Sequence, residues 1–162
     1  MELDTAIEPP WPEGEWEALA TRVAEAAARI APELAPARLQ ASVLFTSDAE
    51  VQQLNHEWRQ RDKPTNVLSF PMLERAHLLV LAEDGPPELI GDIALAQETC
   101  AREAAERGIA LADHAAHLIV HGLLHLAGHD HEESEAAAMA METLETKALV
   151  MLGLPDPYQR GK

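Results

Sequence analysis

Short hydrophobic segments alternate with longer amphipathic ones along the chain. The short segments predict β-strands at residues 3–7, 41–46, 67–70 and 89–95. Hydrophobic residues at helical spacing predict helices from Trp16 to just before Pro32, from Ser47 onward, over about residues 96–107 and 113–127, and from Ser134 onward. We therefore expect an α+β fold in which a small mixed β-sheet packs against several helices.

Two of these helices have recognisable caps and hydrophobic faces. Ser47 and Glu50 have the spacing of a capping box, and the helix that follows is expected to bury Val51, Leu54 and Trp58. The last helix, capped by Ser134, should bury a stripe made of Ala137, Met141, Leu144, Ala148 and Met151. Gly153 and the two prolines after it are expected to end the ordered structure and leave a polar tail.

The stretch between residues 70 and 95 has a less regular pattern. A short hydrophobic run at residues 78–81 is followed by a turn at residues 84–87, and together they predict a hairpin. The strand at residues 89–95 follows, with Gly91 and Asp92 interrupting its hydrophobic residues.

The helix at residues 113–127 is hydrophobic on nearly all its faces, so it is expected to be buried, with histidines on its one polar face. Six of the eight histidines lie between His114 and His131. His121 and His125 are four residues apart, so both imidazoles can point at one metal ion about 2.0–2.1 Å from each nitrogen. His114 and His117 extend the same face, either as groups that orient the ligands or simply as polar residues.

A third ligand can follow the helix. Gly128 can end the helix and turn the chain back, and His131 comes three residues later. Three neutral imidazoles leave a fourth position for water, which is typical of a catalytic zinc site, and zinc lowers the pKa of such water toward about 7. The alternative is a helix whose surface histidines have this spacing by accident.

The spacing His-x-x-x-His-x-x-Gly-x-x-His makes this a zincin-like metal helix. Zincin proteases have a glutamate directly after the first histidine, and it acts as the general base. The residue at that position here is Gly122, so the site lacks the protease base.

Composition indicates one domain over residues 1–162, with about residues 1–12 and 154–162 peripheral. The single cysteine, Cys100, excludes an internal disulfide and is expected to be a small packed residue. The first residues are acidic where a signal peptide needs positive charge, and no hydrophobic run approaches the roughly 18 residues of a membrane span. We therefore expect a cytoplasmic protein without membrane contact.

The formal net charge of −16 argues against sequence-independent nucleic-acid binding over the whole surface, and no DNA partner is expected. Electrostatic screening acts over about 8 Å at physiological salt, so the sign of the charge at the cleft matters more than the total. Residues 59–71 carry three positive charges and one negative charge, the most cationic patch of the chain.

Two segments resemble the signatures of the YbeY family, the bacterial rRNA-maturation endoribonucleases. They are His121-Gly-Leu-Leu-His-Leu-Ala-Gly-His-Asp-His131, and Arg59 with Asp62-Lys-Pro-Thr-Asn-Val-Leu-Ser-Phe-Pro71. Gly91-Asp92-Ile93 is similar to a third, weaker signature, and the resemblance covers about residues 40–152. His129 departs from the family pattern, which has tyrosine before the final Asp-His, and it adds a rival ligand.

The resemblance implies one zinc ion per chain, bound by His121, His125 and His131, with Arg59 facing the metal. It also implies single-stranded rRNA as substrate, a role in 16S rRNA 3′-end maturation and ribosome quality control, and the small ribosomal subunit and its assembly proteins as partners.

A mechanism can be set beside this resemblance as a hypothesis. Zinc polarises a phosphoryl oxygen or delivers hydroxide, while Arg59 offers a planar fork of donors to the phosphate. Asp130 either orients a histidine or serves as the base. The candidates for RNA binding are Arg61, Lys63, Thr65, Asn66 and Ser69. Without the family, Arg59 would be a cation at a helix C-terminus, and Arg61 and Lys63 would be solvated loop residues.

Two other functions stay open. One is a metallohydrolase with another substrate, such as a peptide or a small ester, although Gly122 counts against it. The other is a non-catalytic ribosome-assembly factor whose metal stabilises a binding surface. Three imidazoles also accept nickel, cobalt or copper.

Overall fold

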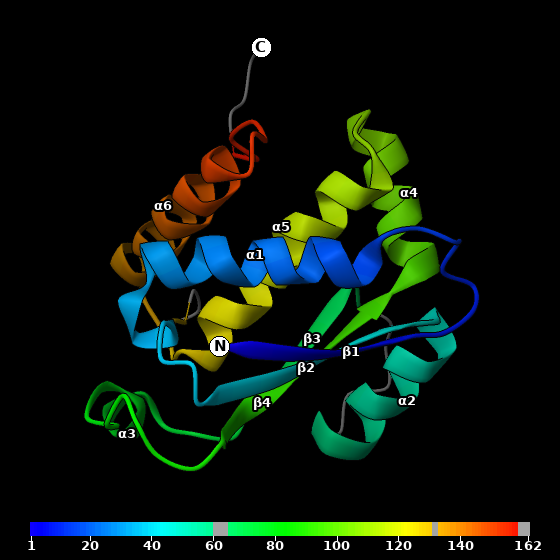
Figure 1. Cartoon of the computed structure of the whole chain (residues 1–162). Helices are drawn as coiled ribbons and strands as arrows, with labels where there is room; N and C mark the ends of the chain where they lie inside the picture. The colour runs from blue at the N-terminus through cyan, green and yellow to red at the C-terminus, as the bar shows by residue number, and fades with distance from the viewer. Residues whose placement is uncertain (60–64, 131–132, 159–162) are drawn as a thin grey trace.

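A four-stranded mixed sheet organises the fold (Figure 1). The computed structural model describes residues 1–59, 65–130 and 133–158, and only the backbone of Arg59. The strands are β1 (Glu2–Ile7), β2 (Leu39–Thr46), β3 (Val67–Pro71) and β4 (Glu88–Ala96), in the spatial order β1-β2-β4-β3. The strands β1, β2 and β4 are parallel, and β3 is antiparallel to β4. The predicted α+β fold with a mixed sheet is thus confirmed.

Helices cover both faces of this sheet (Figure 1). They are α1 (Trp16–Ile30), α2 (Asp48–Arg59), α3 (Arg75–Leu79), α4 (Gln97–Arg107), α5 (Leu111–Leu126) and α6 (Glu135–Met151), with a 3-10 turn at Pro32–Leu34. The main hydrophobic core lies between the sheet and the layer of α1, α5 and α6. A smaller cluster under α2 covers the opposite face of β3 and β4.

The helix α5 lies at the centre of the main core, in contact with α1, α4, α6, β3 and β4. Six of its large hydrophobic side chains are at most 5% exposed: Leu118, Ile119, Val120, Leu123, Leu124 and Leu126. The prediction of a buried helix is confirmed. The prediction that all its histidines lie on a polar, solvated face is wrong, because His114 and His117 are buried as well.

Gly122 allows α5 to approach the sheet closely. A Cβ atom at this position would lie 2.9 Å from Ile93 Cδ1 and 3.1 Å from Ile93 Cγ1. Ile93 on β4 is itself only 1% exposed and has little room to move away. The glycine that follows His121 therefore avoids crowding between α5 and β4.

Trp11 ties the segment between β1 and α1 to the sheet. Its side chain is 6% exposed, and its indole Nε1 donates to the Thr46 carbonyl at 2.8 Å. The ring meets Trp16 and Phe45 edge to face, at centroid distances of 4.8 and 5.0 Å. This segment thus contributes to the core, although residues 1–12 were expected at the periphery.

The predicted hairpin is wrong. Residues of the hydrophobic run instead enter the short helix α3, where the Leu78 amide donates to the Glu74 carbonyl at 3.1 Å. β4 already has β2 on one side and β3 on the other, so no edge is left for another strand. The strand β4 is continuous, with a register shift where Leu89 and Gly91 face successive residues of β2.

The predicted caps are confirmed, but two predicted core residues are exposed. The Ser47 and Ser134 hydroxyls accept hydrogen bonds at the starts of α2 and α6. Trp58 is 72% exposed, because the cluster under α2 is small and does not reach the last turn of that helix. Met151 is also exposed, and Leu149 takes its place in the core.

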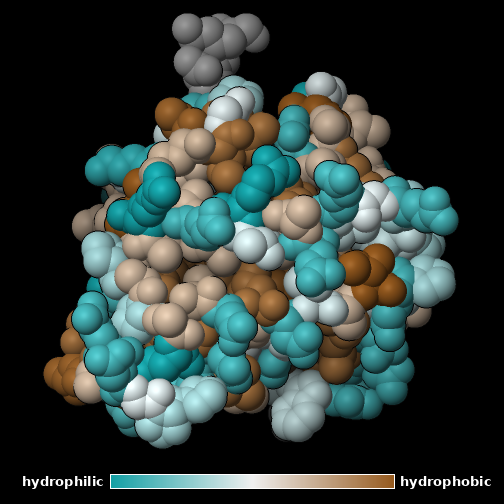
Figure 2. Space-filling model, in the orientation of Figure 1, coloured by the Kyte–Doolittle hydropathy of each residue, from teal (hydrophilic) through white to brown (hydrophobic). Residues whose placement is uncertain are grey.

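Hydrophobic residues are scattered over the visible surface, whereas the single cysteine is buried. In Figure 2, hydrophilic residues spread over the visible face and hydrophobic ones form small separate groups. Within the described residues no single helix is long and apolar enough to cross a membrane; α4 and α5 meet those criteria only as a pair, bent by 114°. Cys100 is buried on α4, as predicted, and burial raises the pKa of its thiol to about 12.

The contact between Gly122 and Ile93 can be tested with a double-mutant cycle. Gly122→Val is expected to lower the free energy of unfolding by about 1–3 kcal/mol, because the new side chain overpacks the interface. In an Ile93→Ala background, which opens space, the same substitution should cost less. Urea denaturation of all four proteins measures the coupling. Strictly additive losses would mean that the two residues are not in contact.

Candidate metal centre and cleft

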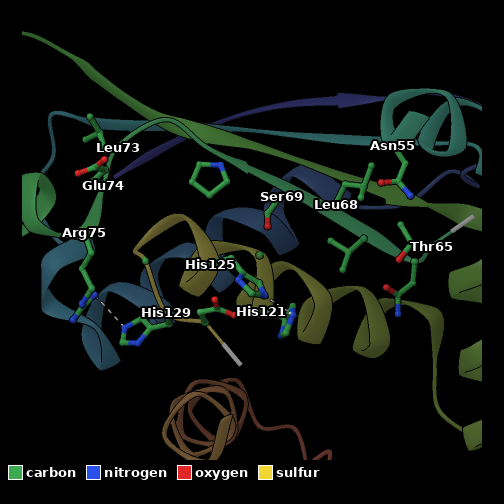
Figure 3. Close-up of a pocket in the computed structure, with 16 residues that line it drawn as sticks. Asn55, Thr65, Leu68, Ser69, Leu73, Glu74, Arg75, His121, His125 and His129 are labelled. Atoms are coloured by element: carbon green, nitrogen blue, oxygen red, sulfur yellow. Dashed lines mark hydrogen bonds between the residues drawn. The ribbon is translucent and has the colours of Figure 1, made fainter. Parts of the chain in front are cut away.

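His121 and His125 converge at the surface of α5. They lie one helical turn apart, and their Nε2 atoms are 3.0 Å from each other (Figure 3). Two nitrogens that bind one tetrahedral zinc ion at 2.0–2.1 Å lie about 3.3 Å apart. The observed pair is close to that spacing, so these two side chains fit a shared metal ion.

The third expected ligand, His131, lies outside the described residues. Within residues 1–59, 65–130 and 133–158, no group of three or more histidine, cysteine, aspartate or glutamate residues is arranged to hold a metal ion. His121 and His125 are therefore a partial ligand set, and the role of His131 stays a prediction.

Gly128 ends α5 and redirects the chain, as predicted. Its φ is +92°, and a Cβ atom would lie 2.4 Å from Arg75 Cβ, so only glycine fits there. The amide of His129 then donates to the Leu124 carbonyl at 3.0 Å. This turn carries the chain past the end of the helix toward Asp130.

Behind the histidine pair lies the buried carboxylate of Glu145 on α6. Its side chain is 1% exposed, and its Oε1 lies 2.9 Å from His121 Nδ1 and 3.2 Å from His117 Nε2. Burial alone would raise the pKa of Glu145, but hydrogen bonds from His117, His121 and Tyr158 outweigh it and lower the pKa to about 2. The ionised carboxylate accepts the Nδ1 proton of His121, which leaves Nε2 as the nitrogen with a lone pair.

His114 has a carboxylate partner of its own. Its Nε2 lies 2.8 Å from Glu103 Oε1 on α4, which also accepts from Asn66 Nδ2 at 2.9 Å. His114 is 1% exposed, and burial lowers the pKa of its imidazole against the opposing effect of Glu103. His114 therefore anchors α5 to α4. His117, by contrast, shares the Glu145 carboxylate with His121.

His129 is turned toward a different acid. Its Nε2 lies 3.3 Å from Glu33 Oε2, and Arg75 Nη1 donates to the same oxygen at 2.7 Å and to the Ala127 carbonyl at 2.7 Å. Burial, followed by the charge of Arg75, lowers the pKa of His129. These contacts join His129 to the Arg75–Glu33 ion pair, at the opposite end of the cleft from Thr65 (Figure 3).

A cleft of about 730 Å³ surrounds the histidine pair. Polar residues from several elements line it: Asn55 from α2, Thr65, Asn66 and Ser69 at β3, Arg75 from α3, and His129 and Asp130 after α5. The sequence candidates Thr65, Asn66, Ser69 and Asp130 thus lie in one cleft with His121 and His125. Arg61 and Lys63 lie outside the described residues, as does the side chain of Arg59, whose backbone ends α2.

Sequence analysis missed the acids and the tyrosine that surround the histidines. Glu145 had a detectable signal, because it lies on the buried face of α6 between Met141 and Ala148, where a charged residue is unusual. Glu33, Arg75 and Tyr158 had no comparable signal, since loops or a short helix bring them to the site. The prediction that order ends at Gly153 and the prolines after it is wrong for residues 154–158, because Tyr158 makes specific hydrogen bonds.

The sheet, the buried helix and the cleft define a class of protein: an α+β protein with a paired-histidine site on its central helix. The family model described as Endoribonuclease YbeY matches residues 6–153, and the chain belongs to this family.

Relatives agree with that family assignment, and a solved structure shares the fold. The chain is 63% identical to an Endoribonuclease YbeY of Erythrobacter litoralis over 98% of both chains. It is 54% identical to that of Novosphingobium aromaticivorans, over 96% of this chain and 95% of the relative. The solution structure of a Thermotoga maritima protein shares the fold, with a TM-score of 0.59 and 22% identity over 98% of this chain and 100% of that one.

The lowered pKa of His114 predicts how stability depends on pH. The unfolded chain takes up a proton near the ordinary histidine pKa of about 6.5, whereas folded His114 resists it. The free energy of unfolding is therefore expected to fall as pH drops below about 6.5, and His114→Gln should make this fall shallower. Urea denaturation between pH 7.5 and 5.5 with a chelator present measures the slope.

The matched control for that experiment is His56→Gln, which changes an exposed histidine on α2. It should leave the slope as in the wild-type protein. Equal slopes for the wild-type protein and His114→Gln would contradict the assignment.

Proposed function

We propose that this chain is a zinc-dependent endoribonuclease that cleaves single-stranded RNA. Its family is described by the name Endoribonuclease YbeY, and relatives with that name align over nearly its whole length. The observation that carries the proposal is the convergence of His121 Nε2 and His125 Nε2, 3.0 Å apart, in an open polar cleft. A site of this kind suits metal-assisted hydrolysis.

The proposed zinc ligands are His121, His125 and His131. These residues would hold zinc, which would supply Lewis-acid chemistry for phosphodiester hydrolysis when bound. The chain contributes the orientation of the ligands: Glu145 keeps the proton of His121 on Nδ1, and the helix sets both rings at the cleft.

The polar lining of the cleft suits an RNA backbone. Thr65, Asn66 and Ser69 provide uncharged hydrogen-bonding groups, which bind phosphates and sugars without reading base sequence. An open cleft of this size accepts a flexible single strand more readily than a stiff duplex. We assign Asp130, at the same cleft, as the candidate that orients a ligand or accepts a proton.

Arg59 is proposed to bind the scissile phosphate. It follows Asn55 by four residues on α2, and residues with this spacing share a face of a helix. Asn55 itself lines the cleft. A guanidinium offers two parallel donors to a phosphate, so it also stabilises charge as that charge builds. Arg61 and Lys63, two and four residues further on, are proposed to hold the flanking RNA.

The packing of Gly122 disfavours a peptidase. Zincin proteases need a glutamate directly after the first histidine, and here a Cβ atom alone would already crowd Ile93. We infer that the substrates are phosphodiesters. Their cleavage depends more on stabilisation of the developing charge than on a glutamate at this position.

The cellular role that we propose rests on the family resemblance. It comprises 16S rRNA 3′-end maturation and ribosome quality control in the cytoplasm, with the small ribosomal subunit and assembly proteins as partners. The charge of −16 fits this setting, since RNA would be bound at a local cleft and held there by the ribosomal context.

Cleavage of a labelled single-stranded RNA by metal-stripped protein, reconstituted stepwise with zinc, tests the proposal. Activity should return at one zinc per chain. His125→Ala should abolish the activity, and Arg59→Ala should lower kcat/KM by about 10²–10³-fold, because it removes a donor to the developing charge. Both variants are checked for folding by circular dichroism, and duplex RNA and DNA of the same sequence serve as competing substrates.

Arg22→Ala, which removes an exposed arginine on α1, is the charge-matched control and should cleave like the wild-type protein. If the cleavage rate depends neither on zinc nor on the His125→Ala and Arg59→Ala substitutions, the activity comes from a contaminating nuclease and the proposal is wrong. Zinc-loaded protein that binds RNA without cutting it would favour the assembly-factor alternative instead.

A further inference from the structure

The chain folds back onto α6 after that helix ends. The Leu154 amide donates to the Leu149 carbonyl at 2.9 Å, and Gly153 adopts a φ of +81° to make the turn. Asp156 Oδ1 then accepts from Thr146 Oγ1 of α6 at 3.2 Å and from the Tyr158 amide at 2.8 Å. Asp156 thereby fixes the position of Tyr158 against the helix.

Tyr158 reaches the carboxylate behind the histidine pair. Its hydroxyl donates to Glu145 Oε2 at 2.8 Å and lies 3.3 Å from His117 Nε2. Its ring meets the His117 ring edge to face, with centroids 5.6 Å apart and planes at 90°. The tyrosine therefore touches both Glu145 and His117, and Glu145 in turn touches His121.

Both oxygens of Glu145 are occupied by these partners. His121 Nδ1 and His117 Nε2 lie at Oε1, and the Tyr158 hydroxyl lies at Oε2. A carboxylate held at both oxygens has one orientation, and His121 is in turn held by the carboxylate. A continuous series of hydrogen bonds thus runs from Asp156 through Tyr158 and Glu145 to His121.

We propose that the segment 156–158 is part of the metal centre and sets its zinc affinity through Glu145. Glu145 and Tyr158 are positioning residues: they hold the His121 ring with Nε2 toward the cleft and touch neither the substrate nor the ion. This inference rests on the proposed function, because it takes His121 as a zinc ligand. Outer partners of a metal-binding histidine typically change metal affinity by about 10–100-fold.

A different result is expected if the hydrogen bonds of Tyr158 and Glu145 are purely structural. If Tyr158 and Glu145 only pack α6 against α5, their loss lowers stability and leaves the zinc affinity of the folded protein unchanged. Zinc affinity and the tautomer of His121 are therefore the measurements that separate the two roles.

Three variants of the full chain test the proposal. Tyr158→Phe removes one hydroxyl and keeps the ring, and Glu145→Gln keeps the shape and removes the charge. Glu142→Gln, one turn away on α6, neutralises a carboxylate without a hydrogen bond to His121 and serves as the matched control. Zinc alone is the probe, and its affinity is measured by competition with a chromophoric chelator. Long-range 1H–15N spectra of the metal-free proteins report the His121 tautomer.

The wild-type protein and Glu142→Gln should bind one zinc with equal affinity. Glu145→Gln should bind it about 10–100-fold more weakly and lose the pure Nδ1-protonated tautomer of His121. Tyr158→Phe should weaken binding by up to about 10-fold. If Glu145→Gln does not fold, Tyr158→Phe decides the question, because that substitution leaves the core packing intact.

Wild-type affinity and an unchanged tautomer in Tyr158→Phe would overturn this inference while leaving the proposed zinc enzyme standing. A wild-type protein that takes up no zinc would instead overturn the proposed function, and the inference with it.

Discussion

Burial of α5 is the constraint on which the rest of the structure depends. This helix of 16 residues is hydrophobic on most of its faces, and such a helix is stable only when neighbours cover it on several sides. α1, α4, α6 and the sheet provide that cover. The histidines of α5 consequently lie against carboxylates of neighbouring helices, at the cleft that the neighbours leave open, or at both. The location of the site therefore follows from the packing of the core.

Acids from other elements, of which Glu145 is fully buried, compensate the histidines. The close pairs are His114 with Glu103, His121 with Glu145, and His129 with Glu33. Each acid comes from a different element, so every pair also joins two parts of the fold. A polar group inside a core is costly unless it is hydrogen-bonded, and a satisfied network favours one arrangement over others. The acidic composition thus has an internal as well as a surface component.

The sequence pattern correctly predicted the features that depend on interactions between residues close in sequence. The strands and helix caps depend on near neighbours, and the convergence of His121 and His125 follows from their spacing of four. The link between His121 and Glu145 spans 24 residues and depends on how α6 packs against α5, which no periodicity encodes. Trp58 was assigned to the core from its spacing alone, although the core beneath α2 is too small to reach it. Long-range packing therefore limited the prediction.

The packing at Gly122 also bears on how this site can diverge over evolutionary time. A glutamate after the first histidine is the single change that would bring the motif to the zincin protease pattern. The space for that side chain is already filled by Ile93, so the change would first harm the fold. A lineage could acquire the glutamate only after a smaller residue replaced Ile93 or after α5 moved outward. The motif of this chain and the zincin protease motif are nearly identical. Conversion of one into the other nevertheless requires a change at Ile93 or in the position of α5 before the glutamate can be accommodated.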